Sequence, residues 1–109
     1  MPVPAFNLYP DFNVVRVSHT ELVVTDLAAS RAFYVDTLGL QVSAEDREMI
    51  CLRAMEERGH HCLILRKGSD PCCSYLAFRV YSEDDVDKAA AHFSAKGMTT
   101  EWVERPFQG

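Results

Sequence analysis

The residues with the clearest potential for chemistry are His19 and Glu21. His19 lies in a run of β-branched residues, and a neutral imidazole held on a rigid strand is a good ligand for iron, manganese or zinc. Glu21 follows two residues later, so on a strand its side chain shares the face of His19. A single histidine does not make a metal site, and Glu21 could reach the same ion only with some distortion. His19 and Glu21 are therefore candidate metal ligands that lack a complete set of partners.

A second candidate segment is His60-His61-Cys62. A zinc site built from these three residues lacks a second ligand pair at the usual spacing, so we discount it. The two histidines are instead expected to cap a strand and to hydrogen-bond to the backbone or to a neighbouring domain. Cys51 and Cys62 are expected to face each other across a hairpin as buried thiols. The four cysteines occur without a secretory signal, which favours reduced thiols in a cytosolic protein.

Composition limits the class of protein. The chain has 109 residues, 48% of them hydrophobic and 25% charged, which suits one compact globular domain. The net charge of −5 argues against a nucleic-acid-binding surface, which needs many Lys and Arg side chains. No stretch reaches the length of a membrane span, and the amino end lacks the basic and apolar regions of a signal peptide.

The hydrophobic pattern predicts a strand, a helix and then three further strands. The strands are expected at Val14–Val24, Leu40–Val42, Met49–Met55 and His61–Arg66, and the helix at residues 27–38. Thr25-Asp26 can cap the helix, and Gly39 can end it.

The pattern then restarts after a loop. A strand is expected at Tyr75–Val80, a helix between the cap at Ser82 and the stop at Gly97, and a last strand at Thr99–Glu104. The sequence thus predicts an α+β fold of paired βαβββ modules, with a lead-in segment at 1–14, a first module at 15–67 and an incomplete second module, strand-helix-strand, at 68–109. An unfinished sheet leaves an exposed edge. Either another chain completes the sheet or the second module is truncated, and we favour truncation.

Two segments resemble a known family. His19–Leu27, with Ser30 and Phe33–Leu40, is similar to the opening module of the glyoxalase/bleomycin-resistance/extradiol-dioxygenase superfamily, which has the vicinal oxygen chelate fold. Ile50–Arg53, Glu56-Glu57 and His60–Arg66 are similar to the amino-terminal domain of homoprotocatechuate (3,4-dihydroxyphenylacetate) extradiol dioxygenases. The resemblance covers Val15 to Gly109.

The resemblance implies oxidative ring cleavage of catechols such as 3,4-dihydroxyphenylacetate by dioxygen, in aromatic catabolism. It implies Fe(II) or Mn(II) held by two His and one carboxylate, which leaves open positions for both reactants. In this family the metal sits in the carboxyl-terminal domain, and the amino-terminal copy usually holds none. A module's first strand supplies a ligand near His19, and His61 falls near the proton-handling His of the catalytic copy. The equivalent ligand position in the second module lies near Tyr75, which is not a histidine.

We therefore expect a non-catalytic amino-terminal domain of a cytoplasmic extradiol dioxygenase that binds no metal itself. It would form a homo-oligomer or pair covalently with a carboxyl-terminal catalytic domain. One alternative is a stand-alone metal-dependent enzyme completed by dimerisation, in which His19 is a true ligand. Another is a metal-free binding module like the bleomycin-resistance proteins, although Trp102 is the only tryptophan available for stacking.

Overall fold

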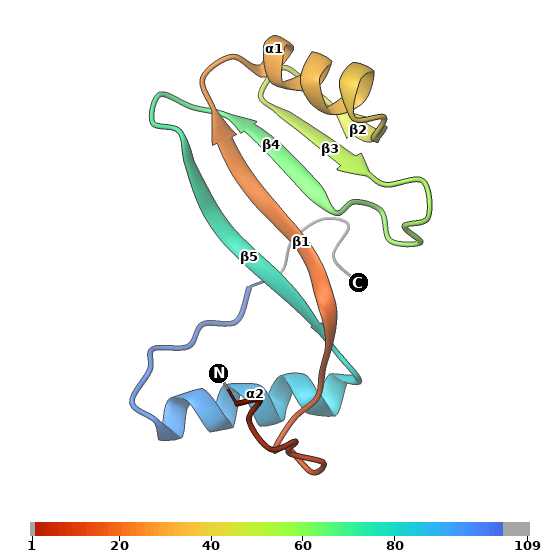
Figure 1. The fold of residues 1–109 in the computed structure, drawn as a ribbon. Helices are drawn as coiled ribbons and strands as arrows, with labels where there is room; N and C mark the ends of the chain where they lie inside the picture. The colour runs from red at the N-terminus through yellow and green to blue at the C-terminus, as the bar shows by residue number, and fades with distance from the viewer. Residues whose placement is uncertain (1, 104–109) are drawn as a thin grey trace. The chain divides into compact units, whose positions relative to one another are not determined.

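The computed structural model describes residues 2–103, which divide into two compact units. One unit comprises residues 17–78, and the other comprises residues 2–16 together with 79–103. Figure 1 follows the chain through both. Among the described residues, no helix has both the length and the apolar character needed to cross a bilayer.

The structure contains a five-stranded mixed sheet. The elements are β1 (Val14–Val24), α1 (Leu27–Arg31), η1 (Ala32–Thr37), β2 (Gln41–Glu45), β3 (Met49–Arg53), β4 (Leu63–Lys67), β5 (Cys72–Val80) and α2 (Glu83–Ala95). The spatial order of the strands is β2-β3-β4-β1-β5, with β1 parallel to β4 and antiparallel pairing along β2-β3-β4. The α+β class and the predicted strand-helix-three-strand order are confirmed.

The helix after β1 begins at Leu27 as predicted and ends at Thr37, one residue before the predicted end. The Asp26 side chain accepts a hydrogen bond from the backbone N–H of Ala29 at 2.9 Å, which satisfies one free donor of the first turn. Gly39 has φ +82°, the left-handed conformation that glycine adopts at a helix end. The second half, however, is a wider π-helical segment, in which the Leu38 N–H donates to the Phe33 carbonyl at 3.0 Å. Hydrophobic spacing alone does not distinguish this wider turn from an α-helix.

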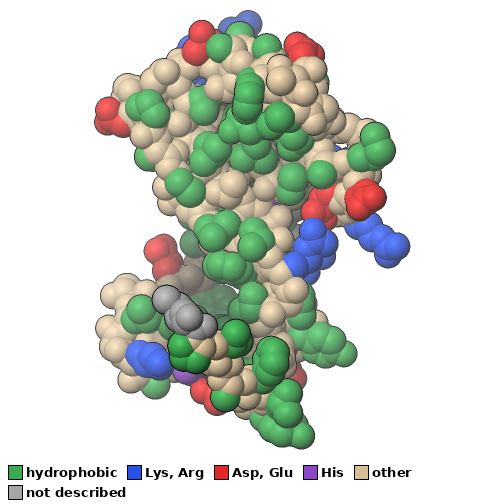
Figure 2. Space-filling view, in the orientation of Figure 1, with side chains coloured by type: hydrophobic (Ala, Val, Ile, Leu, Met, Phe, Trp, Pro, Cys, Tyr) green, Lys and Arg blue, Asp and Glu red, His purple; other side chains and the backbone are tan. Residues whose placement is uncertain are grey.

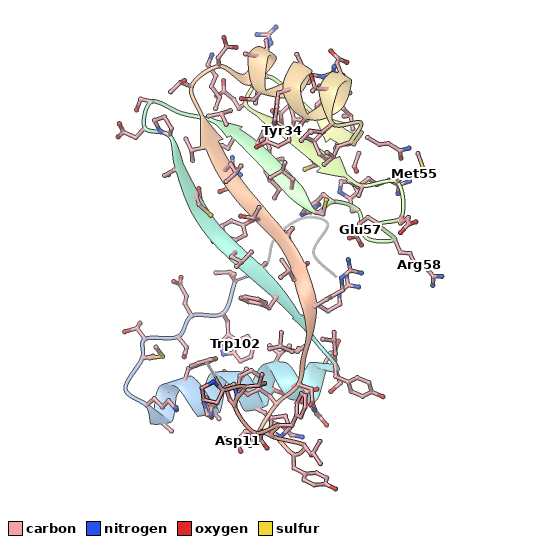
Figure 3. The ribbon with its side chains drawn as sticks, in the orientation of Figure 1. Asp11, Tyr34, Met55, Glu57, Arg58 and Trp102 are labelled. Carbon is pink, nitrogen blue, oxygen red and sulfur yellow. The ribbon has the colours of Figure 1, made fainter. Side chains whose placement is uncertain are left out.

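The core of residues 17–78 lies between the helix and one face of the sheet. Four buried side chains form its centre: Ile50, Leu52, Leu63 and Leu65. Tyr34 of η1, labelled in Figure 3, packs against them, and so does Leu22 of β1. Fully burying a side chain such as Leu52 stabilises the fold by roughly 1.5–3 kcal/mol. Because side chains alternate along a strand, the intervening residues of β1, β3 and β4 project from the face away from the helix.

The other unit is built around α2. The Ser82 side chain accepts a hydrogen bond from the backbone N–H of Asp85, in agreement with the predicted cap, and Gly97 with φ +81° follows the helix. Phe12 packs edge-on against His92 and Phe93 with ring centroids 5.4 and 5.6 Å apart.

His92 of α2 is half-buried. Its Nδ1 lies 2.9 Å from the Oδ2 atom of Asp11, which is labelled in Figure 3. The His92 imidazole is therefore paired with a carboxylate.

The predicted strand at Thr99–Glu104 is wrong over its described part. Residues 99–103 have no regular secondary structure, and Glu104 lies outside the described residues. A strand forms only where a neighbouring strand receives its backbone hydrogen bonds. The described sheet ends at β5, and none of its strands pairs with this segment. The domain boundaries at 14/15 and 67/68 stay a prediction.

Candidate functional site

The sheet face away from the helix carries the polar residues that the sequence singled out. On β1, His19 and Glu21 are buried, with 4% and 7% of their surface exposed. On β3, the fully buried Cys51 pairs with Ile64 of β4, and Glu21 pairs with the same residue from the other side. The parallel and antiparallel ladders around β4 therefore bring residues that are far apart in sequence onto neighbouring strands.

Three of the four histidines meet on this part of the structure. The His19 and His61 rings are 4.7 Å apart in an edge-to-face arrangement, and the His60 and His61 rings are 5.3 Å apart. The His19 Nε2 atom lies 3.3 Å from the Tyr75 hydroxyl, and its Nδ1 atom lies 3.0 Å from the Ser18 hydroxyl. The position near Tyr75 that lacks a histidine thus supplies a hydroxyl group to His19 instead.

A loop before β4 holds His60 and His61. The predicted strand at His61–Arg66 begins later, at Leu63, so both histidines lie in the loop between β3 and β4. The Ser43 hydroxyl of β2 donates a hydrogen bond to the His60 carbonyl, and the Cys62 N–H donates to the Leu52 carbonyl at 2.8 Å. The side chain of Glu57, labelled in Figure 3, accepts from the Gly59 N–H at 3.0 Å. These contacts tie the loop to β2 and β3.

The imidazole of His61 is buried. Only 6% of its surface is exposed, and its buried Nε2 atom meets no hydrogen-bond partner in the part of the chain that the structure describes. Its Nδ1 atom lies 3.0 Å from Nδ1 of His60. Burial lowers the pKa of His61, and the neighbouring His19 and His60 lower it further. Neutral imidazole is the form that ligates metals or accepts a proton.

Glu21 is occupied by an ion pair. The Nε atom of Arg66 on β4 donates a hydrogen bond to the Oε1 atom of Glu21 at 2.9 Å, and a terminal nitrogen of the guanidinium lies 2.8 Å from the same oxygen. Hydrogen bonding to Glu21 raises the pKa of Arg66, so the guanidinium stays charged. The structure therefore gives the Glu21 carboxylate a partner in Arg66, while His19 contacts His61 and Tyr75. That His19 and Glu21 share an ion stays a prediction.

The structure places a different set of possible ligands together. Each of Cys51, His60 and His61 offers one ligand atom, and the three atoms lie within 4.8 Å of one another. From the sequence, Cys62 was the candidate thiol ligand beside the two histidines. In the structure, Cys51 takes that place. The alternation of side chains along β3 indicates which face of the sheet Cys51 takes. The local sequence does not indicate that the loop with His60 and His61 folds back to this residue. Burial raises the pKa of the Cys51 thiol, which Arg66 partly offsets.

All four cysteines are free thiols. Cys51 is buried as predicted and Cys62 is only half-buried, whereas Cys72 and Cys73 are exposed.

The facial ligand set expected for ferrous iron or manganese does not match this group. That set needs two histidines and a carboxylate. Within residues 2–103, the group of three candidate ligands that come together contains a thiol and no carboxylate. Cys51, His60 and His61 therefore do not supply the facial ligand set.

A sequence model of the Glyoxalase/Bleomycin resistance protein/Dioxygenase superfamily matches residues 16–105, most of the chain. The chain belongs to this superfamily. The mixed sheet with its helix on one face agrees with the vicinal oxygen chelate fold.

Two curated relatives match most of this chain. A manganese-dependent 2,3-dihydroxybiphenyl 1,2-dioxygenase of Geobacillus genomosp. 3 is 30% identical over 91 residues, which are 84% of this chain and 29% of that protein. A metapyrocatechase of Pseudomonas sp. (strain CF600) is 29% identical over 91 residues, which are 83% of this chain and 30% of that protein. The chain thus spans less than a third of the length of these relatives.

The structural neighbours are more similar in sequence. Homoprotocatechuate 2,3-dioxygenase from Brevibacterium fuscum, in its anaerobic complex with 3,4-dihydroxyphenylacetate, has a TM-score of 0.80 and 49% identity. The match covers 87% of this chain and 30% of that chain. The Y257F variant of the same enzyme gives a TM-score of 0.81 at 49% identity and covers 26% of its chain.

Proposed function

We propose that this chain acts as the amino-terminal, non-catalytic domain of an extradiol ring-cleaving dioxygenase. The substrate class would be catechols such as 3,4-dihydroxyphenylacetate, cleaved with dioxygen in aromatic catabolism. The observation that carries the proposal is the 49% identity and TM-score of 0.80 to homoprotocatechuate 2,3-dioxygenase over 87% of the chain. The metal of the complete enzyme would be Fe(II) or Mn(II), held by a separate catalytic domain.

Exposed apolar side chains support a role in assembly. Leu76 and Phe78 on the edge strand β5 are 51% and 55% exposed, and Val17 on the adjacent β1 is 51% exposed. The space-filling view in Figure 2 shows hydrophobic side chains on the visible surface of the molecule. Large exposed apolar groups mark surfaces that another domain or chain covers. The partner would be a carboxyl-terminal catalytic domain or further copies of the chain.

A domain exchange tests this function. The matching segment of the Brevibacterium fuscum enzyme is replaced by this chain, and cleavage of 3,4-dihydroxyphenylacetate is followed by oxygen uptake. A chimera that folds, takes up metal and turns over substrate supports the proposal, and the Brevibacterium enzyme without its own segment is the control. A soluble, metal-loaded chimera without turnover contradicts it.

The isolated chain provides the complementary assay. Supplied with Fe(II) or Mn(II), the catechol and oxygen, it is expected to give no ring-cleaved product. Turnover by the chain alone would overturn the non-catalytic assignment and favour the second candidate, a stand-alone enzyme that dimerises through the exposed edge strand β5. In that case His19→Ala should lower the metal content, and light scattering should report a dimer.

We also propose a cytoplasmic location. The support is the set of four free thiols, since oxidising compartments favour disulfides. Cytoplasmic and exported cell fractions would be labelled separately with a thiol reagent. Recovery of the labelled chain in the cytoplasmic fraction supports this location, and recovery in the exported fraction contradicts it.

A further inference from the structure

We propose that Cys51, His60 and His61 form a binding site for a zinc-type divalent cation, with the fourth position left to water. The site goes beyond the dioxygenase assignment, which needs no metal in this chain. Its three ligand atoms lie within 4.8 Å of one another. With metal–ligand bonds of about 2.0–2.3 Å, neighbouring ligands of tetrahedral zinc stand roughly 3.3–3.8 Å apart, so small side-chain rotations close the site.

The types of ligand select the metal. One sulfur and two imidazoles are the donors that zinc takes in proteins, whereas manganese and magnesium prefer carboxylate and water oxygens. Three protein ligands with an open fourth position are the usual arrangement of zinc sites that bind water or a small molecule.

The second, independent observation is the state of His61. The residue is only 6% exposed, and its buried Nε2 atom has no hydrogen-bond partner among residues 2–103. Buried polar atoms in folded proteins are nearly always paired, so an unpaired nitrogen on a residue of this cluster points to an absent partner. A metal ion would satisfy this nitrogen.

The scaffold holds the ligands before any ion binds. Cys51 lies on β3, which is paired on both sides, with β2 and with β4, so its position is rigid. The loop that carries the histidines is tied to β2 by the Ser43 hydroxyl and to β3 by the Cys62 N–H. His60 is half-buried, while the other two ligands are buried, so an ion would enter on the side of His60.

His19 is a neighbour of the site and not a ligand in this proposal. Both its ring nitrogens lie near hydroxyl groups, of Ser18 and of Tyr75, and its ring packs edge-on against His61. Removing it should loosen the orientation of His61 without removing a donor. A His19 variant is therefore a control that should weaken metal binding less than loss of a ligand does.

The test uses the whole chain carrying Cys72→Ser and Cys73→Ser, which remove the two exposed competing thiols. Zinc and cobalt are titrated into this protein and into versions that also carry Cys51→Ala, His61→Ala, Cys62→Ala or His19→Phe. Circular dichroism checks that each is folded. We expect one ion per chain and a sulfur-to-cobalt charge-transfer band.

Cys51→Ala should abolish the charge-transfer band. Cys51→Ala and His61→Ala should each weaken zinc binding by more than about 100-fold, because loss of a group that only orients a ligand already costs about 10–100-fold and these two residues are ligands themselves. Cys62→Ala should leave affinity and spectrum unchanged, and His19→Phe should weaken binding by at most about 10-fold.

Two results would overturn the site. One is a folded parent protein that takes up no zinc or cobalt. The other is a Cys51→Ala protein that keeps the cobalt band and the affinity. If Cys51→Ala does not fold, X-ray absorption of the zinc-loaded parent decides, because absence of a sulfur neighbour at about 2.3 Å rejects the proposal.

Discussion

The ion pair between Glu21 and Arg66 predicts an asymmetric effect of removing either partner. The Glu21 side chain is only 9% exposed, whereas that of Arg66 is 47% exposed. Arg66→Met keeps much of the aliphatic stem but leaves a buried carboxylate without its charge partner. Glu21→Leu removes the buried charge and leaves a guanidinium that water can solvate.

The magnitude follows from these exposures. Removing one partner of a fully buried pair costs about 3–5 kcal/mol, and an exposed pair contributes at most about 1 kcal/mol. Because Arg66 is half-exposed, water can partly replace it, and we expect Arg66→Met to lower the free energy of unfolding by about 2 kcal/mol. Glu21→Leu should cost less than about 1 kcal/mol, and the coupling in the double variant should be about 1.5 kcal/mol.

Urea unfolding followed by far-ultraviolet circular dichroism measures these values. Trp102 fluorescence is unsuitable, because this residue belongs to the unit of residues 79–103 and not to that of residues 17–78. An equal or larger cost for Glu21→Leu, or a coupling below about 0.5 kcal/mol, would refute the reasoning from unequal burial. The slope of the free energy of unfolding against urea concentration must be the same in every variant, since a changed slope would mean that the unfolded state had altered.

Three further predictions rest on packing, backbone conformation and exposure. Leu52→Ala removes a fully buried side chain at the centre of the core. It should lower the free energy of unfolding by about 2–5 kcal/mol in the same urea assay. A cost below about 1 kcal/mol would show that the core tolerates the cavity. Gly39→Ala should lower the free energy of unfolding by roughly 1–2 kcal/mol because φ is +82°. The cost comes from the backbone conformation, since a Cβ at this position would meet no atom within 4 Å. Gly39→Asn is the control, because asparagine tolerates this conformation better. In the folded, metal-free protein, iodoacetamide should modify the exposed Cys72 and Cys73 quickly and Cys51 slowly, because burial shields the Cys51 thiol and raises its pKa. Mass spectrometry of timed samples measures the order of labelling. Early labelling of Cys51 would contradict the structure.

The local signals in the sequence were sufficient for most of the fold. Apolar alternation located β1 at Val14–Val24, and polar side chains placed Asp26 and Ser82 at helix starts. These features depend on residues that are near one another in the chain, so periodicity and capping preferences report them. The motif from His19 to Leu40 was also enough to indicate the superfamily, which the match over residues 16–105 confirms.

The candidate site depended on tertiary structure. His60 and His61 are adjacent in sequence, but the thiol that joins them comes from Cys51 on a neighbouring strand and not from the adjacent Cys62. The pairing of β3 with β4 and the course of the connecting loop decide this, and neither is encoded in local spacing. The partner of Glu21 is Arg66 for the same reason, since the parallel register of β1 with β4 brings them together.

The failed strand at residues 99–103 has the same physical cause. A β-strand is a cooperative structure that exists only when another strand supplies its hydrogen-bond partners. The sequence by itself determined which segments favour helix or strand and which face each side chain takes. Only the tertiary structure decided which strands find partners and which of the histidines, thiols and carboxylates become neighbours, because those contacts join residues that are distant along the chain.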